Sequence, residues 1–351
     1  MRKIRLGKTG LLVTKPALGC LPLQRASMDD AVKILRRAYD AGINYFDTAN
    51  SYTDSEEKIG RALHDVRRGI VISTKSQGRD KKTVAAHIDN SLKMLRTDYI
   101  DLFQFHMADY LPDPEDPDGA FAAALEAKRA GKVLHIGITA HLLDMAFRQV
   151  ESGCFETMQF PFSYLATERE RDLVALCRER DVGFIAMKGL AGGLLTNAGA
   201  CFAFLEQYDN AVPIWGVQTM AELEEWIALS ENPPVLDDAL TAVIEGDRAE
   251  LSGAFCRGCG YCQPCAVGIE IQNCARMKRF LRRMPTRLYL TPEWREKMHK
   301  IDSCIDCGLC KSRCPYGLDI PNLLREQLLD YDEFCAAHGL PPLEGAAPTE
   351  T

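Results

Sequence analysis

The sequence contains no apolar run that could cross a membrane, since a spanning helix needs about 20 consecutive apolar residues and no stretch of this chain approaches that length. The basic residues in the opening MRKIRLGKTG are not followed by an apolar segment, so no signal peptide is expected. An excess of positive charge is also missing. The net charge is −7 and the pI is near 5.6, which argues against a nucleic-acid-binding protein. With 46% hydrophobic and 26% charged residues, the composition indicates a soluble, cytoplasmic protein with no membrane partner.

Cysteine, by contrast, is abundant. The chain has 14 cysteines, and nine of them fall between Cys256 and Cys314. A secreted disulfide scaffold would be small and would carry an export signal. Clustered cysteines in a chain without such a signal indicate a metal centre instead. Cys274 and the five scattered cysteines are expected to be ordinary thiols; the five are Cys20, Cys154, Cys177, Cys201 and Cys335.

Strand and helix patterns alternate through most of the chain. A predicted hairpin with its turn at Gly7–Gly10 leads into eight predicted strands, each followed by a helix or a short helical segment. The strands end at or near Cys20, Asp47, Lys75, His106, Thr139, Phe162, Lys188 and Val217. Eight such units favour a TIM barrel. A doubly wound α/β sheet is the alternative, but the first strand-to-helix turn has no G-x-G-x-x-G sequence.

Four polar residues lie at or just beyond the ends of three successive predicted strands. Asp47, Lys75 and His106 end the strands, and Tyr52 lies in a short loop before a helix that Asp54 is expected to cap. In a parallel barrel these ends lie on one face, where chemistry is usually placed. We therefore expect the four side chains to lie close together.

Their chemistry suits carbonyl reduction. A free phenol has a pKa of about 10, and an ammonium group beside it is expected to lower the pKa of Tyr52. Asp47 would keep Lys75 charged and in place, and His106 would orient the substrate oxygen. A tyrosine in this setting can give a proton to a carbonyl oxygen as hydride arrives at the carbon. Each residue alone has an ordinary structural explanation, but the four together favour catalysis.

The pattern resembles the aldo-keto reductase superfamily. The matching motifs are FDTANSYTDSEEKIG, STK and FQFH, and the likeness extends over about residues 1–230 through IGIT, MQFPFSY, AMKGLAGG and IWGVQTMAELEE. The resemblance implies a barrel that binds NADP or NAD across its C-terminal face, with Asp47, Tyr52, Lys75 and His106 as the catalytic tetrad. The nucleotide contacts that it implies are Thr139, Gln159, Met187, Lys188, Gly189, Leu190, Gly192, Gly193, Gly216, Gln218 and Thr219.

The sequence departs from the family's usual pattern in three ways. Thr139 and Ala140 stand where Ser-Asn is usual, and Met187 stands where an aromatic side chain often stacks on the nicotinamide. No arginine follows Gly216, where a clamp for the 2′-phosphate is often found. The choice between NADPH and NADH therefore stays open.

The clustered cysteines form two related segments. CRGCGYCQPCAVGIEI starts at Cys256, and CIDCGLCKSRCPYGLDI starts at Cys304. The second has the C-x2-C-x2-C-x3-C-P spacing of a 4Fe–4S ferredoxin, and the first has C-x2-C-x2-C-x2-C. Structural zinc is the alternative, but zinc sites usually use two separated C-x2-C pairs.

In ferredoxins with two clusters, the fourth cysteine of each motif binds the other cluster. We therefore expect two 4Fe–4S clusters with exchanged fourth ligands. One ligand set would be Cys256, Cys259, Cys262 and Cys314, and the other would be Cys304, Cys307, Cys310 and Cys265.

The segment between the two motifs is predicted to be helical and is strongly basic. Residues 275–300 contain nine Lys and Arg against two Glu, a local net charge of +7. Barrel and module together resemble the ferredoxin-like, iron–sulfur branch of the aldo-keto reductases. The charge is explained either by a solvated helix face or by a docking patch for an acidic electron carrier such as ferredoxin or flavodoxin.

These observations predict the domain organisation. Pro233 and Pro234 are expected to end the barrel. We expect an α/β domain, the (β/α)8 TIM barrel, over residues 1–232, a linker helix over 233–254, a small all-α ferredoxin-like domain over 255–325 and a loose tail over 326–351.

Three functions are compatible with the motifs. The first is a nicotinamide-dependent reductase of a small-molecule aldehyde or ketone. The second is an electron-transfer protein whose clusters relay electrons to a redox centre at the barrel mouth; a flavin would normally link one-electron and two-electron steps, and no flavin motif is present. The third, a non-catalytic nucleotide-binding regulator, does not account for the complete tetrad.

Overall fold

The computed structural model describes residues 1–251, 255–283 and 286–340. The chain divides into two compact units. One comprises Met1–Ala191 and Asn197–Gly246, and the other comprises Gly192–Thr196 and Asp247–Thr351. The division between Gly246 and Asp247 falls inside the segment that the sequence predicts to be a linker helix.

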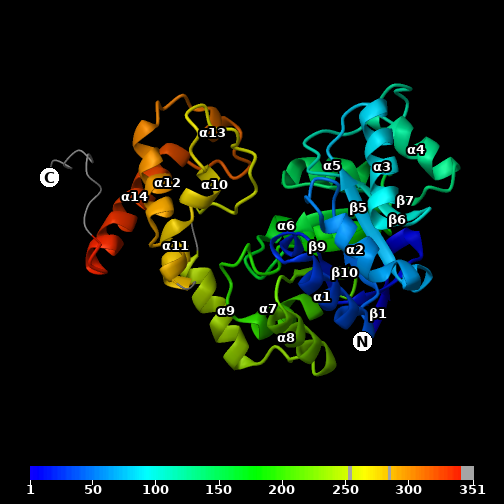
Figure 1. The fold of residues 1–351 in the computed structure, drawn as a ribbon, viewed down its shortest axis with the longest axis horizontal. Coiled ribbons are helices and arrows are strands. Elements are labelled where there is room, and N and C mark those ends of the chain that lie inside the picture. Colours follow the sequence, from blue (N-terminus) through cyan, green and yellow to red (C-terminus); the bar gives the residue numbers. More distant parts are fainter. Residues whose placement is uncertain (252–254, 284–285, 341–351) are drawn as a thin grey trace. The chain divides into compact units, whose positions relative to one another are not determined.

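The first unit is built on a closed barrel of eight parallel strands, which confirms the predicted fold (Figure 1). The strands follow one another around the barrel in chain order, and the last pairs with the first. They are β3 (Ala17–Gly19), β4 (Tyr45–Asp47), β5 (Val71–Ser76), β6 (Ile100–Phe105), β7 (Val133–Thr139), β8 (Thr157–Pro161), β9 (Gly183–Met187) and β10 (Ala211–Gly216).

Each barrel strand is followed by a helix that covers the outside of the barrel. The helices are α1 (Met28–Asp40), α2 (Ser55–Leu63), α3 (Lys81–Leu95), α4 (Ala120–Arg129), α5 (Leu143–Glu151), α6 (Glu168–Glu179), α7 (Ala198–Glu206) and α8 (Met220–Glu231). Side-chain caps start several of them: Ser27 accepts from the Asp30 N–H, and Thr167 forms a full capping box with Glu170. Asp54 stands before α2 but forms no cap hydrogen bond; its carboxylate accepts from Lys58 at 2.8 Å instead.

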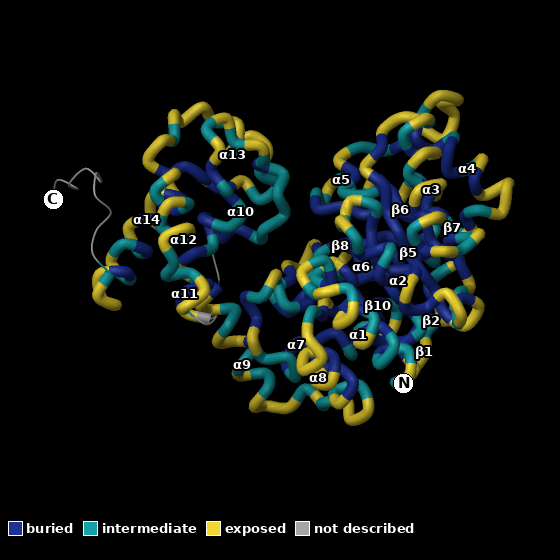
Figure 2. Tube along the Cα trace, in the orientation of Figure 1, coloured by how far each residue is buried: buried dark blue, intermediate teal, exposed yellow. Residues whose placement is uncertain are grey.

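A hairpin closes the amino-terminal end of the barrel. Its strands β1 (Arg2–Arg5) and β2 (Leu12–Lys15) pair in antiparallel fashion, as predicted. Side chains of the hairpin join a buried apolar cluster at that end of the barrel, so the opposite end is the one left for chemistry. The cluster contains Leu6, Val13, Ala17, Tyr45, Val71, Leu102, Ile185, Val212 and Ile214. Figure 2 shows this buried interior along the strands.

The second unit is helical in its described residues, as predicted. It contains part of α9 (Asp238–Glu250), followed by α10 (Ile271–Cys274), α11 (Met277–Arg283), α12 (Pro292–His299), α13 (Leu309–Ser312) and α14 (Ile320–Ala337). The long helix α14 buries Leu324, Leu328 and Tyr331. It therefore extends the domain past residue 325, where the sequence suggests that the tail begins.

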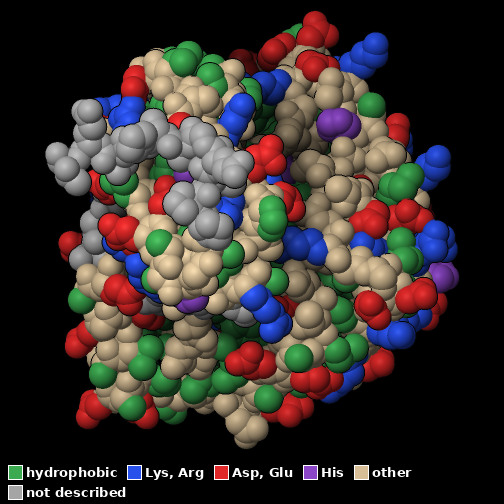
Figure 3. Space-filling model, turned by 60° about the vertical axis from the view of Figure 1, so that its left-hand side comes forward, with side chains coloured by type: hydrophobic (Ala, Val, Ile, Leu, Met, Phe, Trp, Pro, Cys, Tyr) green, Lys and Arg blue, Asp and Glu red, His purple; other side chains and the backbone are tan. Residues whose placement is uncertain are grey.

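Over the described part of the chain, no helix combines the length and the apolar character that a membrane span requires. Acidic and basic side chains are interspersed over the face drawn in Figure 3.

Candidate functional site

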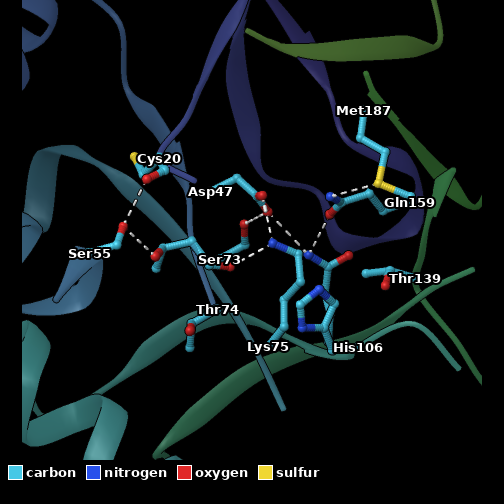
Figure 4. A network of polar contacts seen from close by, with 12 residues as sticks. Cys20, Asp47, Ser55, Ser73, Thr74, Lys75, His106, Thr139, Gln159 and Met187 are labelled. Carbon is cyan, nitrogen blue, oxygen red and sulfur yellow. Dashed lines mark hydrogen bonds and ion pairs between the residues drawn. The ribbon is translucent and has the colours of Figure 1, made fainter. Parts of the chain in front are cut away.

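The barrel brings three of the four predicted catalytic residues to its carboxyl end. Asp47 is the last residue of β4, Lys75 lies near the end of β5, and His106 follows β6 directly. The parallel register aligns Asp47 with Ser73 and Lys75 with Gln104. Because side chains alternate along a strand, Ser73 faces the same side as Lys75. This places their polar groups together inside the barrel mouth (Figure 4).

A buried ion pair lies at the centre of this group. The Lys75 ammonium donates to Asp47 Oδ1 at 2.6 Å and to the Thr48 carbonyl at 2.5 Å. Lys75 is 1% exposed and Asp47 is 2% exposed. Ser73 donates to the second carboxylate oxygen at 2.5 Å, and Gln104 donates to the same oxygen at 3.4 Å. Both charges are therefore paired and hydrogen-bonded, as burial requires.

Tyr52 and His106 flank this ion pair. Their rings meet edge to face, with centroids 5.6 Å apart, and Lys75 Nζ lies 5.5 Å from the centre of the Tyr52 ring. In the described chain the Tyr52 hydroxyl forms no hydrogen bond. The structure thus brings all four residues into one neighbourhood.

The ionisation of these two rings differs from the expectation based on Lys75. Burial raises the pKa of the Tyr52 phenol, and the Asp47 carboxylate and the Cys20 thiol add to this effect. The sequence leads us to expect a lowered pKa, but the carboxylate and burial prevail here. Burial, with a contribution from Lys75, lowers the pKa of His106 to about 3. The site therefore presents a neutral phenol and a neutral imidazole.

Three further residues of this neighbourhood do not stand out in the sequence. Ser73 and Gln104 hold the Asp47 carboxylate through hydrogen bonds. They lie two residues before Lys75 and His106, so the alternation of side chains along a strand could have identified them. His141 follows β7 and is 5% exposed. Burial, then Lys188 and His106, lowers the pKa of His141 far below its usual range, so its imidazole is also neutral.

The residues predicted to contact the nicotinamide also lie at the strand ends. Gln159 accepts from Gln104 at 3.0 Å, and its amide nitrogen lies 3.7 Å from Met187 Sδ. Thr139 Oγ1 accepts from the Met107 N–H at 2.8 Å. A hydrogen-bond chain thus links Gln159 to the Asp47 carboxylate through Gln104 (Figure 4).

The loop predicted to line the pyrophosphate has an irregular backbone. Lys188, Ala191, Gly192 and Gly193 all have positive φ values, between 48° and 91°. Such turns can direct successive N–H groups toward an anion. Gly189 has a packing role, because a Cβ on it would lie 2.4 Å from the Trp215 ring. Leu190 belongs to the same loop and is partly buried.

The residues predicted near the adenosine follow β10. A Cβ on Gly216 would lie 2.9 Å from Pro22 Cγ. Thr219 caps α8 through a capping box with Glu222, which gives it a structural role. Gln218 Oε1 accepts from Arg25 Nη1 at 3.3 Å. Arg25 therefore brings a cation to this end of the site from the segment after β3, where the sequence pattern gives no indication of one.

The two cysteine segments have positive φ values at three equivalent positions. Gly258, Gly260 and Gly268 have positive φ values of 64°, 86° and 80°. Asp306, Gly308 and Gly317, at the equivalent places in the second segment, have values of 49°, 73° and 63°. The repeat seen in the sequence is therefore also a structural repeat.

The thiols form two electrostatic groups. Burial raises the pKa of Cys256, and the neighbouring Cys259 and Cys314 thiols add to the effect. Burial likewise raises the pKa of Cys262 to about 12, with contributions from Cys256, Cys259 and Cys314. In the second group, burial raises the pKa of Cys310, and Cys304 and Cys265 add to it. Cys314 of the second segment thus contributes to the pKa shifts of Cys256 and Cys262, and Cys265 of the first contributes to that of Cys310.

This donor set fits iron–sulfur clusters better than zinc. Within the described ranges, no three His, Cys, Asp or Glu side chains gather as a single metal ion requires. Four thiolates on one zinc ion must converge to about 2.3 Å from it. In a 4Fe–4S cluster each thiolate binds a different iron, so the sulfurs stand farther apart.

Ion pairs partly neutralise the basic segment between the motifs. Lys278 and Arg282 both pair with Asp330. Lys297 pairs with Glu270 and Glu293. These pairs favour a solvated helix face for part of the segment and reduce the charge available for docking a partner.

Comparison with known proteins gives the family. The model of the aldo/keto reductase family matches residues 17–200, just over half of the chain. The model of the 4Fe-4S dicluster domain matches residues 255–319. The protein belongs to the aldo/keto reductase family and carries a 4Fe–4S domain at its C-terminal side.

Two curated relatives and one solved structure illustrate the similarity. The chain is 30% identical over 210 residues to the uncharacterized oxidoreductase YqkF of Bacillus subtilis, covering 56% of this chain and 67% of the relative. It is 32% identical over 242 residues to L-glyceraldehyde 3-phosphate reductase of Escherichia coli, covering 59% and 64%. It thus spans about two thirds of these relatives. An aldo-keto reductase from Bacillus halodurans shares the fold, with a TM-score of 0.61 and 22% identity over 70% of this chain and 96% of that one.

Proposed function

We propose that this protein reduces an aldehyde or ketone with NADPH or NADH, using Tyr52 as the proton donor. The observation that carries the proposal is the buried Asp47–Lys75 ion pair beneath the Tyr52 and His106 rings. The family match supports an oxidoreductase. When bound, the nicotinamide supplies the hydride.

The four side chains have distinct tasks in this proposal. Tyr52, held neutral by its raised pKa, donates its proton to the carbonyl oxygen as the carbon accepts hydride. The nearby Lys75 ammonium stabilises the phenolate that forms. Asp47 balances the lysine charge, and the neutral imidazole of His106 donates a hydrogen bond that orients the substrate oxygen. Solvent then returns the proton to Tyr52.

The direct test is turnover by the full-length protein, reconstituted with iron and sulfide under anaerobic conditions. A panel of aldehydes and ketones should consume reduced nicotinamide and yield the matching alcohols. Tyr52→Phe should lower kcat by about 10²–10⁴-fold, the usual contribution of a positioned acid, while nucleotide affinity stays within twofold. Unchanged kcat in Tyr52→Phe would rule out the assigned proton donor.

In the C-terminal module we propose two 4Fe–4S clusters with exchanged fourth ligands. The proximity of Cys314 to Cys256 and Cys262, and of Cys265 to Cys310, supports this pairing. A cluster would supply one-electron transfer. Two clusters predict about eight iron and eight sulfide per chain, and about four of each would refute the second cluster.

A second candidate function is electron relay to an external carrier. The dicluster domain favours it, and residues such as Arg287 and Lys300 in the basic segment would serve an acidic ferredoxin or flavodoxin. Under this proposal a flavin at the barrel mouth would accept the hydride and pass on single electrons, so reduced nicotinamide with added flavin should bleach the clusters, and an added acidic carrier should then reoxidise them. If the clusters do not bleach during carbonyl turnover, they take no part in the reaction, and electron relay is excluded.

A further inference from the structure

Arg276 places a guanidinium group directly on the first cysteine loop. A Cβ built on Gly258, which lies between Cys256 and Cys259, would be 2.8 Å from Arg276 Cζ. The side chain is held by three other contacts. Its Nε donates to the Gln272 carbonyl at 2.8 Å, its Nη1 lies 3.5 Å from the Gly192 carbonyl, and its guanidinium lies over the Phe280 ring, 4.7 Å from the centroid.

This guanidinium is partly buried. Burial lowers the pKa of Arg276, and Cys256, Tyr289 and Cys259 oppose that effect. Among the described residues no carboxylate forms an ion pair with Arg276.

The second cysteine loop has a different charge at the equivalent place. Asp306 occupies the position that Gly258 has in the first loop, with the same left-handed backbone. Its carboxylate pairs with Arg325 on α14, and both side chains are about half exposed, at 57% and 46%. The pair is neutral as a whole and in contact with water, so its field on nearby sulfur is weak.

The geometry points to Arg276 as a positioning residue that raises the reduction potential of the cluster held by Cys256, Cys259, Cys262 and Cys314. A reduced cluster carries one more negative charge than an oxidised one, and a close cation in a low-dielectric setting stabilises that charge. Gly258 makes this approach possible, because any side chain there would meet the guanidinium. The inference rests on the proposed pair of clusters and is independent of carbonyl reduction.

The test is a redox titration of the reconstituted full-length protein, followed by electron paramagnetic resonance, with iron and sulfide counted in every sample. Arg276→Gln should shift the midpoint of one cluster to a more negative potential and leave the other unchanged. Arg276→Lys keeps the positive charge, so the midpoint of this cluster should stay close to that of the unaltered protein. Arg325→Gln is the matched change beside the second loop. It should leave the midpoint of the cluster that responds to Arg276→Gln unchanged.

Three outcomes would overturn the inference. In the first, Arg276→Gln retains full iron and both midpoints are unchanged. In the second, both midpoints move equally, which would show a general effect on the domain. In the third, Arg276→Gln and Arg276→Lys both lose a cluster, which would make the side chain a packing element. An iron content of about four atoms per chain in the unaltered protein would instead refute the two-cluster proposal, whatever the variants do.

Discussion

The Asp47 carboxylate and the Lys75 ammonium form an ion pair of 2.6 Å inside the barrel mouth, with less than 4% of either side chain exposed. The pair joins two adjacent strands, and Ser73 and Gln104 fix the carboxylate from the other side. Lys75 Nζ is thereby held 5.5 Å from the centre of the Tyr52 ring. The proposed chemistry and the stability of the barrel therefore depend on the same contact.

Breaking this ion pair should cost both stability and activity. Asp47→Asn leaves a buried ammonium without its partner, so the free energy of unfolding should fall by about 3–5 kcal/mol. Asp101→Asn is a matched control, because Asp101 pairs with Arg67 at 2.5 Å near the amino-terminal end of the barrel. Both variants should lose similar stability in urea, but only Asp47→Asn should lose turnover when assayed well below its melting temperature. Equal loss of turnover would mean that the Asp47 effect is purely structural.

The pH dependence of reduction should lack a histidine step. Because the pKa of His106 is lowered to about 3, its imidazole stays neutral at every pH above that value. Because the pKa of Tyr52 is raised, the phenol keeps its proton well beyond neutral pH. Reduction should therefore be flat between about pH 5 and pH 8, and alcohol oxidation, which needs the phenolate, should rise with pH. An ionisation near pH 6.5 in kcat/KM that disappears in His106→Gln would contradict this account.

Arg25 should influence the choice between NADPH and NADH. Its guanidinium donates to Gln218 at the expected adenosine end, and an arginine is well suited to bind a 2′-phosphate. Arg25→Gln should raise the KM for NADPH several-fold and leave the KM for NADH unchanged. Arg37→Gln removes an exposed arginine that pairs with Glu224 on α8, and it should change neither constant. Equal effects of Arg25→Gln on both nucleotides would exclude a phosphate contact.

The exchange of fourth cysteines predicts which variants should resemble each other. Cys314→Ser should perturb the same resonance signal as Cys256→Ser, and Cys265→Ser should perturb the signal affected by Cys304→Ser. Cys274 is a suitable control, since its thiol lies 3.6 Å from the Lys297 carbonyl and buried among helices, and Cys274→Ser should keep full iron. If Cys314→Ser instead matches Cys304→Ser, each motif binds its own cluster.

Strand ends and cysteine spacing were the features that the sequence could reveal. The barrel strands follow from apolar runs that stop at polar residues, which is why Asp47, Lys75 and His106 could be placed on one face. The repeat of C-x2-C-G-x-C was equally visible, because tight spacing is a local property. The strand ends and the cysteine repeat are both patterns among residues close together in the sequence, and local backbone geometry determines the structure that such patterns form.

Contacts between distant segments could not be predicted in this way. The raised pKa of Tyr52 depends on how deeply the ring is buried and how near the carboxylate lies, and neither is local. Gly189 resembles a phosphate-binding glycine in sequence, but the structure also requires it to pack against Trp215. The contact of Arg276 with Gly258 likewise depends on how the turn between α10 and α11 packs on the first cysteine loop.

The most direct test of the central claim follows the hydride itself. The reconstituted protein is given a carbonyl substrate and NADPH or NADH that carries deuterium at the hydride position. Tyr52-assisted reduction predicts alcohol with one deuterium on the former carbonyl carbon, formed without any change in cluster oxidation state. Alcohol that lacks deuterium, or deuterated nicotinamide oxidised only as the clusters are reduced, would contradict direct hydride transfer and favour electron relay.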